Sequence, residues 1–360
     1  MKNHKRLIEI IILAVLLLVL AGGYFGERIF AESIHAENLI FSTEELSQRI
    51  TEELMDGHDS FMTYVSGMTN EQLVAINRNL DGFFGHVDSY TVIRKVNDHV
   101  MQVYFNLEVS DNYYAYQSIV HGETITNNVN AQVLAEKVKQ IMQSCKTDSD
   151  YQTVVNYHDY IVSHTKYGFL SGEEEKLSYT AYGALLRETA VCNGYAEAME
   201  LLLLCSDIDT YMAVGFTPDG AHAWNIVLID GEWYHVDTTW DDPVDADSGN
   251  ESGNGTHVYL NVNDEVMKKT HTWNQSAYPE CVSMVDNYYI REHISFSTVQ
   301  ELSTYISTRY PAVTEYEVQL TNHALSQSDI KLIMQEIHSA SGTYIMYESG
   351  EYSVYRIQFE

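Results

Sequence analysis

Three residues in the middle of the chain have the types and the order expected of a thiol acyl-transfer site. Cys192 lies in AVCNGYAEAMELL, His222 opens HAWNIVLI and Asp237 ends EWYHVD. A cysteine supplies the nucleophile, a histidine takes up its proton, and a carboxylate orients the imidazole and stabilises its charged form. The sequence therefore predicts a Cys-His-Asp catalytic triad, provided that the fold brings these residues together.

The local sequence indicates how each residue is positioned. Cys192 is predicted to start an apolar helix, where unpaired backbone N–H groups and the helix dipole lower the pKa of a thiol. Gly194 permits close packing or a close approach by substrate. The runs 222–229 and 232–237 flank Gly231, so they are predicted to form a hairpin whose paired positions sum to about 461. This register brings the first residue of one strand close to the carboxylate that ends the other.

Each residue on its own has a simpler structural explanation. A lone cysteine beside apolar residues is usually a packed core thiol. A histidine on a strand is usually a hydrogen-bonded polar residue, and an aspartate after a strand usually caps a turn. The prediction depends on the agreement between the order of the three residues and the elements expected to carry them.

The segment from about 150 to 285 resembles the transglutaminase-like (papain-like thiol) superfamily in its bacterial extracytoplasmic form. The family's cysteine motif, of the type G-x-C-x-G-Y-A, corresponds to residues 190–196, with Ala190 where Gly is usual. The motif H-A-W-N corresponds to residues 222–225, and D-x-T-W to residues 237–240. YHDYIVSHTKY and YLNVNDEVMKKTHTWNQSAYPEC are similar to the family's opening and closing segments.

The resemblance implies acyl transfer by a thiol. A thioester forms on Cys192 and is then resolved by water or by an amine. The backbone N–H of Cys192 is the natural first donor to the oxyanion, and Tyr182 is a candidate side-chain donor. Trp224 and Trp240 flank the triad and either shield it from water or fill the core.

The fold class is predicted to be α+β, because an apolar helix is followed by strand-like runs in the middle of the chain. Four parts are expected: a membrane-targeting segment, an N-terminal module without chemistry of its own, the transglutaminase-like domain and a small C-terminal module. Their predicted bounds are 1–26, 37–145, 148–295 and 298–360.

Patterns in the two flanking modules predict their elements. Residues 42–56 are expected to be a helix, because Ser42 and Glu45 have the spacing of a capping box. Residues 101–110 alternate as a half-buried strand does, and the Tyr- and Thr-rich residues 113–126 are expected to continue that sheet. Helical patterns follow at about 130–144 and 150–164. The tail is predicted to be helix, strand, helix and a final hairpin near Ser349, and residues 245–256 a long loop.

The N-terminus has the layout of a membrane-targeting segment. Residues 1–6 are basic, and residues 7–25 are apolar apart from Glu9. Nineteen residues are long enough to cross the hydrocarbon core of a bilayer, and the basic flank places the rest of the chain outside the cytoplasm. An uncleaved single-pass anchor, a cleaved signal peptide that leaves a secreted protein, and a buried core helix remain as alternatives.

Composition excludes several classes of protein. The 360 residues include 20 Lys and Arg against 51 Asp and Glu, so the net charge is −31. Without residues 1–26, which hold three basic residues and one acidic residue, it becomes −33. Nucleic acid is not expected as a partner, because little basic surface is available. A hydrophobic content of 45% excludes a disordered acidic chain.

No cofactor and no metal are predicted. The 15 histidines form no H-x-H or H-E-x-x-H motif, and no glycine-rich phosphate loop is present. The acidic run that begins at Asp241 lacks the Gly and Glu spacing of an EF-hand. The four cysteines are compatible with disulfides outside the cell, but their connectivity cannot be read from sequence.

The expected function is that of an extracytoplasmic cysteine-dependent acyl-transfer enzyme. Hydrolysis of peptide or isopeptide bonds is favoured over cross-linking, because no amine-acceptor site is recognisable. The expected partners are peptide or protein substrates at the cell surface, such as surface proteins or cell-wall peptides. The alternatives are a cross-linking transglutaminase and a non-catalytic binding or assembly module with the same fold.

Overall fold

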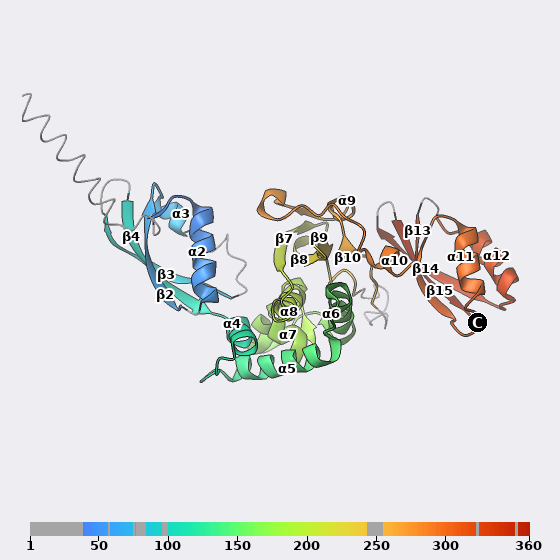
Figure 1. Cartoon of the computed structure of the whole chain (residues 1–360), viewed down its shortest axis with the longest axis horizontal. Coiled ribbons are helices and arrows are strands. Elements are labelled where there is room, and N and C mark those ends of the chain that lie inside the picture. Colours follow the sequence, from blue (N-terminus) through green and yellow to red (C-terminus); the bar gives the residue numbers. More distant parts are fainter. Residues whose placement is uncertain are drawn as a thin grey trace, which may run out of the picture. The chain divides into compact units, whose positions relative to one another are not determined.

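The structure is a computed structural model that describes most of the chain (Figure 1). The described residues are 39–56, 58–74, 76, 84–95, 100–242, 255–321, 324–349 and 352–360. They fall into two compact units, which divide between Tyr113 and Tyr114. The predicted membrane-targeting segment and most of the predicted long loop lie outside the described residues. Among the described residues, no helix has the length and apolar character needed to cross a bilayer.

The first unit is a four-stranded sheet with helix α2. The sheet has the order β1-β2-β4-β3. The elements are β1 (Leu39–Ile40), α2 (Thr43–Met55), β2 (Ser60–Ser66), α3 (Asn70–Val74), β3 (Gly85–Lys95) and β4 (Val100–Val109). Ser42 caps α2 by accepting from the backbone N–H of Glu45, as its spacing predicted. In β4 every second residue, from Val103 to Leu107, is buried, which confirms the predicted alternation.

One predicted extension of this sheet is wrong. Residues 113–126 do not continue the sheet: the chain forms α4 (Asp111–Tyr116) and then a short π-helix (Gln117–His121). Ser110 accepts a hydrogen bond from the backbone N–H of Tyr113 at the start of this helix. Tyr113 and Ala115 are buried. Helix N-capping and burial therefore outweigh the strand propensity of the aromatic residues here.

In the second unit a group of helices precedes a five-stranded sheet. The helical elements are α5 (Val129–Cys145), α6 (Asp150–His164), a 3₁₀ helix (Gly172–Tyr179), α7 (Ala181–Leu186) and α8 (Cys192–Leu204). A short parallel pair joins β5 (Lys166–Tyr167) to β6 (Thr189–Ala190). Helix α8 contacts α5, α6 and α7 as well as two strands of the sheet, so it is the central helix of the unit (Figure 1).

The five-stranded sheet is antiparallel and has the order β10-β9-β8-β7-β11. Its strands are β7 (Thr210–Thr217), β8 (Gly220–Ile229), β9 (Glu232–Val236), β10 (Leu260–Val262) and β11 (Thr272–Trp273), with α9 (Asp264–Met267) and α10 (Tyr288–Arg291) in the connections that follow. Ala223 of β8 packs with Ala196 of α8. Trp224 and Ile226 belong to a second apolar cluster. The neighbouring residues Ala223 and Trp224 therefore pack into different clusters, because successive side chains of a strand point to opposite faces of the sheet.

The C-terminal part is a second sheet, of order β12-β13-β15-β14, with two helices. Its elements are β12 (Ser295–Phe296), α11 (Val299–Ser307), β13 (Glu315–Thr321), α12 (Gln327–Ile337), β14 (Gly342–Ser349) and β15 (Tyr352–Phe359). The predicted order of elements and the predicted final hairpin are confirmed, with Ser349 opposite Tyr352. Val354 of β15 also enters the core cluster that contains Trp224, so the two sheets of the second unit share buried side chains.

Candidate active site

Cys192 is the first residue of α8, as predicted. Val191 precedes it as a helix cap without a side-chain hydrogen bond. The backbone N–H groups of Gly194 and Tyr195 donate to the Val191 carbonyl, so those of Cys192 and Asn193 are the ones that can face an anion. Gly194 allows the start of α8 to pack closely on the preceding segment. A Cβ at this position would lie 2.8 Å from the carbonyl oxygen of Ser178 and 2.9 Å from that of Thr180. The glycine therefore serves the packing that fixes the thiol.

The β8–β9 hairpin brings His222 and Asp237 together. Asn225 is paired with Val236 and Ile229 with Glu232, which is the predicted register. The Nε2–H of His222 donates to Oδ2 of Asp237 across 2.7 Å. The other carboxylate oxygen accepts from the backbone N–H groups of Thr239 and Trp240 at 3.0 and 3.1 Å. These bonds anchor the carboxylate, and the imidazole is held through it.

The charges of the three residues reinforce one another. Burial disfavours the imidazolium, but the charge and hydrogen bond of Asp237, with help from Cys192, raise the pKa of His222 to about 10. Burial also disfavours the thiolate, but the hydrogen bond and charge of His222 lower the pKa of Cys192, together with N–H donation from Ala223 and Asn193. The geometry therefore favours a thiolate–imidazolium pair, the reactive form of a catalytic cysteine.

His271 is a fourth residue at this site, and sequence reasoning missed it. Its Nε2–H also donates to Oδ2 of Asp237, at 3.0 Å, and its Nδ1 contacts the hydroxyl of Thr270 at 2.8 Å. The side chain is fully buried. His271 occurs in KKTHTW, within the segment that resembles the family's closing segment, and this was the only available signal. No spacing rule links it to Asp237, 34 positions earlier.

Aromatic rings surround the imidazoles. The rings of His222 and Trp224 are stacked with centroids 5.9 Å apart, and Trp240 lies 6.1 Å from His222 and 4.6 Å from His271. Trp224 also donates from Nε1 to Nδ1 of His235 at 3.0 Å and is 1% exposed. Trp224 is thus a core residue that also supports the site.

Two tyrosines that precede the cysteine motif, Tyr167 and Tyr182, are placed differently. Tyr182, the predicted oxyanion donor, lies on α7 and its ring packs against the guanidinium of Arg187. Tyr167 interacts electrostatically with the thiol: burial, and then the negative charge of Cys192, raise the pKa of this phenol. Tyr167 is half-exposed, and it is the last residue of the segment YHDYIVSHTKY. The structure therefore favours Tyr167 over Tyr182 as a phenol beside the nucleophile.

The structure leaves all four cysteines as free thiols. Cys145 and Cys192 are partly exposed, whereas Cys205 and Cys281 are buried. Burial raises the pKa of Cys205 to about 12 and also raises that of Cys281. Among these three thiols with perturbed pKa values, only Cys192 is shifted towards the reactive thiolate.

Three clusters of described residues have ligand atoms close enough to hold a metal ion. One is His222, Asp237 and His271 at the site above, and a second is His235, Asp264 and Cys281 in the core beside it. In both, the imidazole nitrogens already take part in hydrogen bonds with protein groups. Trp224 donates to Nδ1 of His235, so the proton of this ring is on Nε2, which donates to Asp264 at 2.9 Å. The third cluster, His158, Asp159 and His257, contains none of the predicted catalytic residues and is treated below.

Comparison with known proteins finds a family match to part of the chain. Residues 134–238 match the family model of the transglutaminase-like superfamily. This range is less than a third of the chain and includes α8, β7, β8 and β9 together with all three predicted catalytic residues.

The individual relatives are distant. The chain is similar to human kyphoscoliosis peptidase, with 24% identity over 120 residues that cover 30% of this chain and 18% of that protein. A transglutaminase crystal structure covers 56% of this chain and 58% of its own, at 14% identity and a TM-score of 0.25. The match to the periplasmic domain of TgpA from Pseudomonas aeruginosa covers 42% of this chain and 66% of that chain, also at 14% identity and a TM-score of 0.25. At such scores neither structure supports an inference about this chain.

Proposed function

We propose that this chain is a cysteine-dependent acyl-transfer enzyme that hydrolyses peptide or isopeptide bonds, because residues 134–238 match the family model of the transglutaminase-like superfamily. Cys192, His222 and Asp237 are its catalytic triad in this proposal. One observation carries it: Asp237 holds His222 at 2.7 Å, and His222 in turn lowers the pKa of a thiol at a helix start.

The reaction follows from the placement of these groups. The Cys192 thiolate attacks the substrate carbonyl, and the backbone N–H groups at the start of α8 stabilise the oxyanion that forms. The His222 imidazolium gives its proton to the departing amine, which leaves a thioester on Cys192. A water molecule then attacks the thioester while His222 accepts its proton, so the carboxylic acid is released and the thiolate–imidazolium pair is restored.

The surface beside the thiol suits a peptide segment. Tyr167 is 47% exposed, Phe169 60% and Tyr179 46%. The rings of Phe169 and Tyr179 are 5.9 Å apart, and electrostatic coupling links Tyr167 to both Cys192 and Tyr179. Exposed aromatic side chains bind apolar side chains of an extended segment. The proposed substrates are therefore proteins or peptides with accessible apolar residues.

The proposed location is extracytoplasmic. It is supported by the basic residues 1–6, the apolar run 7–25 and the acidic composition of the rest of the chain. Surface proteins and cell-wall peptides are the substrates that such an enzyme would meet. Cross-linking is the second possible outcome of the same chemistry, because an amine can resolve the thioester in place of water.

Incubation of the chain with casein and a fluorescent primary amine tests the proposal. We expect cleavage of casein without incorporation of the amine, and we expect Cys192→Ala to abolish the cleavage. Cys145→Ala is the matched control, because it removes a partly exposed thiol from another helix. Amine incorporation would instead identify a transglutaminase. Wild-type behaviour indistinguishable from that of Cys192→Ala would identify a non-catalytic binding module.

A further inference from the structure

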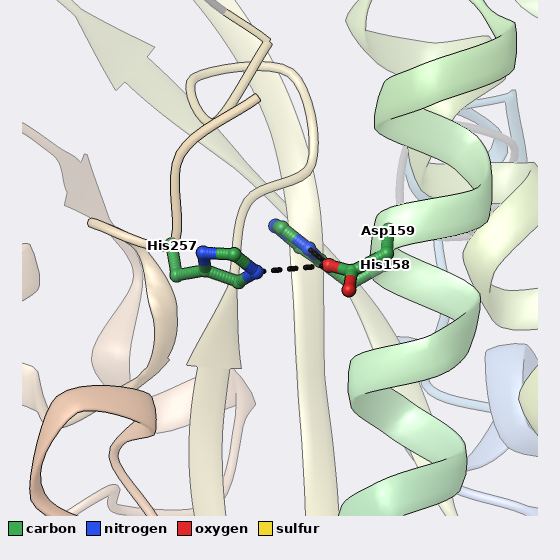
Figure 2. Close-up of side chains that lie close together, drawn as sticks. All are labelled: His158, Asp159 and His257. Carbon is green, nitrogen blue, oxygen red and sulfur yellow. Dashed lines mark hydrogen bonds and ion pairs between the residues drawn. The ribbon is translucent and has the colours of Figure 1, made fainter. Parts of the chain in front are cut away.

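The third cluster joins two segments that are distant in the sequence, and nothing in the thiol chemistry uses it. His158 and Asp159 lie on α6, and His257 precedes β10 (Figure 2). Oδ1 of Asp159 lies 3.0 Å from Nδ1 of His158 and 2.9 Å from Nε2 of His257. Two imidazole nitrogens therefore converge on one carboxylate oxygen, as Figure 2 shows.

The remaining nitrogen of each ring faces a second carboxylate. Nε2 of His158 is 3.1 Å from Oδ2 of Asp241, and Nδ1 of His257 is 3.0 Å from Oε1 of Glu317. A neutral imidazole has one N–H and one lone pair. If both rings were neutral, a lone pair in each would face a carboxylate oxygen. The cluster therefore requires two further protons or one divalent cation.

Because both nitrogens lie beside Asp159 Oδ1, one cation placed there would accept the lone pair of each ring. We propose that His158 Nδ1, Asp159 Oδ1 and His257 Nε2 bind a divalent transition-metal ion, with Zn²⁺ as the best match. Two imidazoles and one carboxylate form a ligand set that zinc accepts, and a fourth position stays open to water. Ligand atoms around tetrahedral zinc are about 3.3 Å apart, so Asp159 Oδ1 needs to move only about 0.4 Å away from each imidazole nitrogen, and all three atoms already lie within 4.8 Å of one another.

The surroundings of the cluster are those of a metal site. A histidine ligand normally donates its second ring N–H to a carboxylate, which fixes the tautomer and raises the basicity of the metal-binding nitrogen. Asp241 is the carboxylate that would accept the second ring N–H of His158, and Glu317 is the one that would accept that of His257. This distinguishes the cluster from the one around His235, whose Nδ1 already accepts from an indole N–H.

Both supporting carboxylates are themselves held in place. Asp241 is fully buried and accepts from the hydroxyl of Thr256 at 2.9 Å and from the backbone N–H of Tyr259 at 3.0 Å. Glu317 accepts from the hydroxyl of Tyr289 at 2.6 Å and pairs with Arg356 at 3.3 Å. These contacts orient the ligands before any metal arrives, which lowers the cost of binding.

The ligands are also ordered and accessible. The side chain of His158 is 1% exposed and that of His257 14%, whereas that of Asp159 is 51% exposed and offers an access path. The ring of Tyr288 stacks on His257 with centroids 3.7 Å apart. A bound ion would tie α6 to the segment before β10 and, through Glu317, to β13. We therefore expect the metal to stabilise the fold of the second unit.

Metal content and cobalt spectroscopy of the untagged full chain test the proposal. After incubation with Zn²⁺ and removal of free metal, we expect elemental mass spectrometry to find about one zinc ion per chain. Substitution by Co²⁺ should give the intense visible absorption of a tetrahedral site, without a thiolate-to-cobalt band, because the ligands are nitrogen and oxygen only. Absence of stoichiometric zinc, or a thiolate band that points to Cys281 or Cys192, would overturn the assignment.

Single substitutions then locate the ion. Asp159→Asn and His257→Gln each remove one ligand at a position that is not fully buried, and we expect zinc affinity to fall at least 100-fold. The increase in melting temperature that zinc causes should be lost in both variants. His164→Gln is the matched control, because it changes an exposed histidine on the same helix. Full zinc affinity in both ligand variants would show that the metal binds elsewhere.

Discussion

Asp237→Asn removes the negative charge beside His222 and keeps the size of the side chain. The oxygen that remains still accepts from the backbone N–H groups of Thr239 and Trp240, so the turn after β9 stays anchored. The amide nitrogen that replaces Oδ2 faces two N–H donors, those of His222 and His271. The substitution therefore tests charge and hydrogen-bond acceptance at a single atom.

The separation of the two charges sets the expected magnitude. Nε2 of His222 and Oδ2 of Asp237 are 2.7 Å apart. Each charge is spread over several atoms, so the charge centres are about 4 Å apart, and their attraction is about 4 kcal/mol at an effective dielectric constant of about 20. This energy corresponds to a factor of about 10³ in the protonation equilibrium of His222. We expect kcat/KM for peptide hydrolysis to fall by about 10²- to 10⁴-fold.

The pH dependence of Cys192 alkylation provides the assay, with the modified peptide quantified by mass spectrometry. Asp237 raises the pKa of His222 to about 10, so in the wild-type chain the imidazolium persists to that pH and lowers the pKa of Cys192, and alkylation should begin at a lower pH than for an ordinary thiol. Without the carboxylate, His222 loses its proton at lower pH. The alkylation rate should then rise only through about pH 8 to 9, as for an ordinary thiol.

Two comparisons make the assay specific. Asp230→Asn is the matched control, because it makes the same change at an exposed position of the same hairpin, where the backbone φ of 51° suits asparagine. Cys205, whose pKa is raised to about 12 by burial, is an internal reference for a slow thiol. An Asp237→Asn chain with wild-type melting temperature and an unchanged alkylation profile at Cys192 would refute the charge coupling.

Three further predictions follow from individual contacts. His271→Gln removes one of two imidazole donors to Asp237, and we expect about a tenfold loss of kcat with little change in KM; unchanged kinetics, with His293→Gln as an exposed control, would assign His271 a packing role only. Gly194→Ala forces a Cβ to within 2.8 Å of the Ser178 carbonyl oxygen, so urea denaturation should show a loss of about 1–3 kcal/mol. Gly168→Ala, where the nearest neighbour is 3.8 Å away, should be tolerated, and equal stability of the two variants would contradict the packing argument. Trp224→Phe leaves Nδ1 of buried His235 without its indole donor, so the free energy of unfolding should fall by about 1–3 kcal/mol, which chemical denaturation measures; a stability equal to that of wild type would mean that His235 finds another donor.

Local patterns predicted the elements that carry the triad because short-range rules govern them. Gly231 fixes a two-residue hairpin connection, and the length of that connection sets the register of β8 and β9. The helix that begins at Cys192 could be predicted from the apolar run that forms it and from the loop-like segment before it. The same kind of reasoning failed for residues 113–126, because strand propensity depends on burial and packing that the local sequence does not specify.

By itself, the sequence determined the order of the helices and strands in the C-terminal part, the hairpin that presents His222 and Asp237, and the helix start at Cys192. Only the tertiary structure decided which distant side chains share an atom. Asp237 accepts from His271, 34 positions later, and Asp159 contacts His257, 98 positions later. Contacts of this range depend on how α6, the five-stranded sheet and the C-terminal sheet pack together. Packing of this kind is set by burial over the whole unit, and no spacing along the chain encodes it.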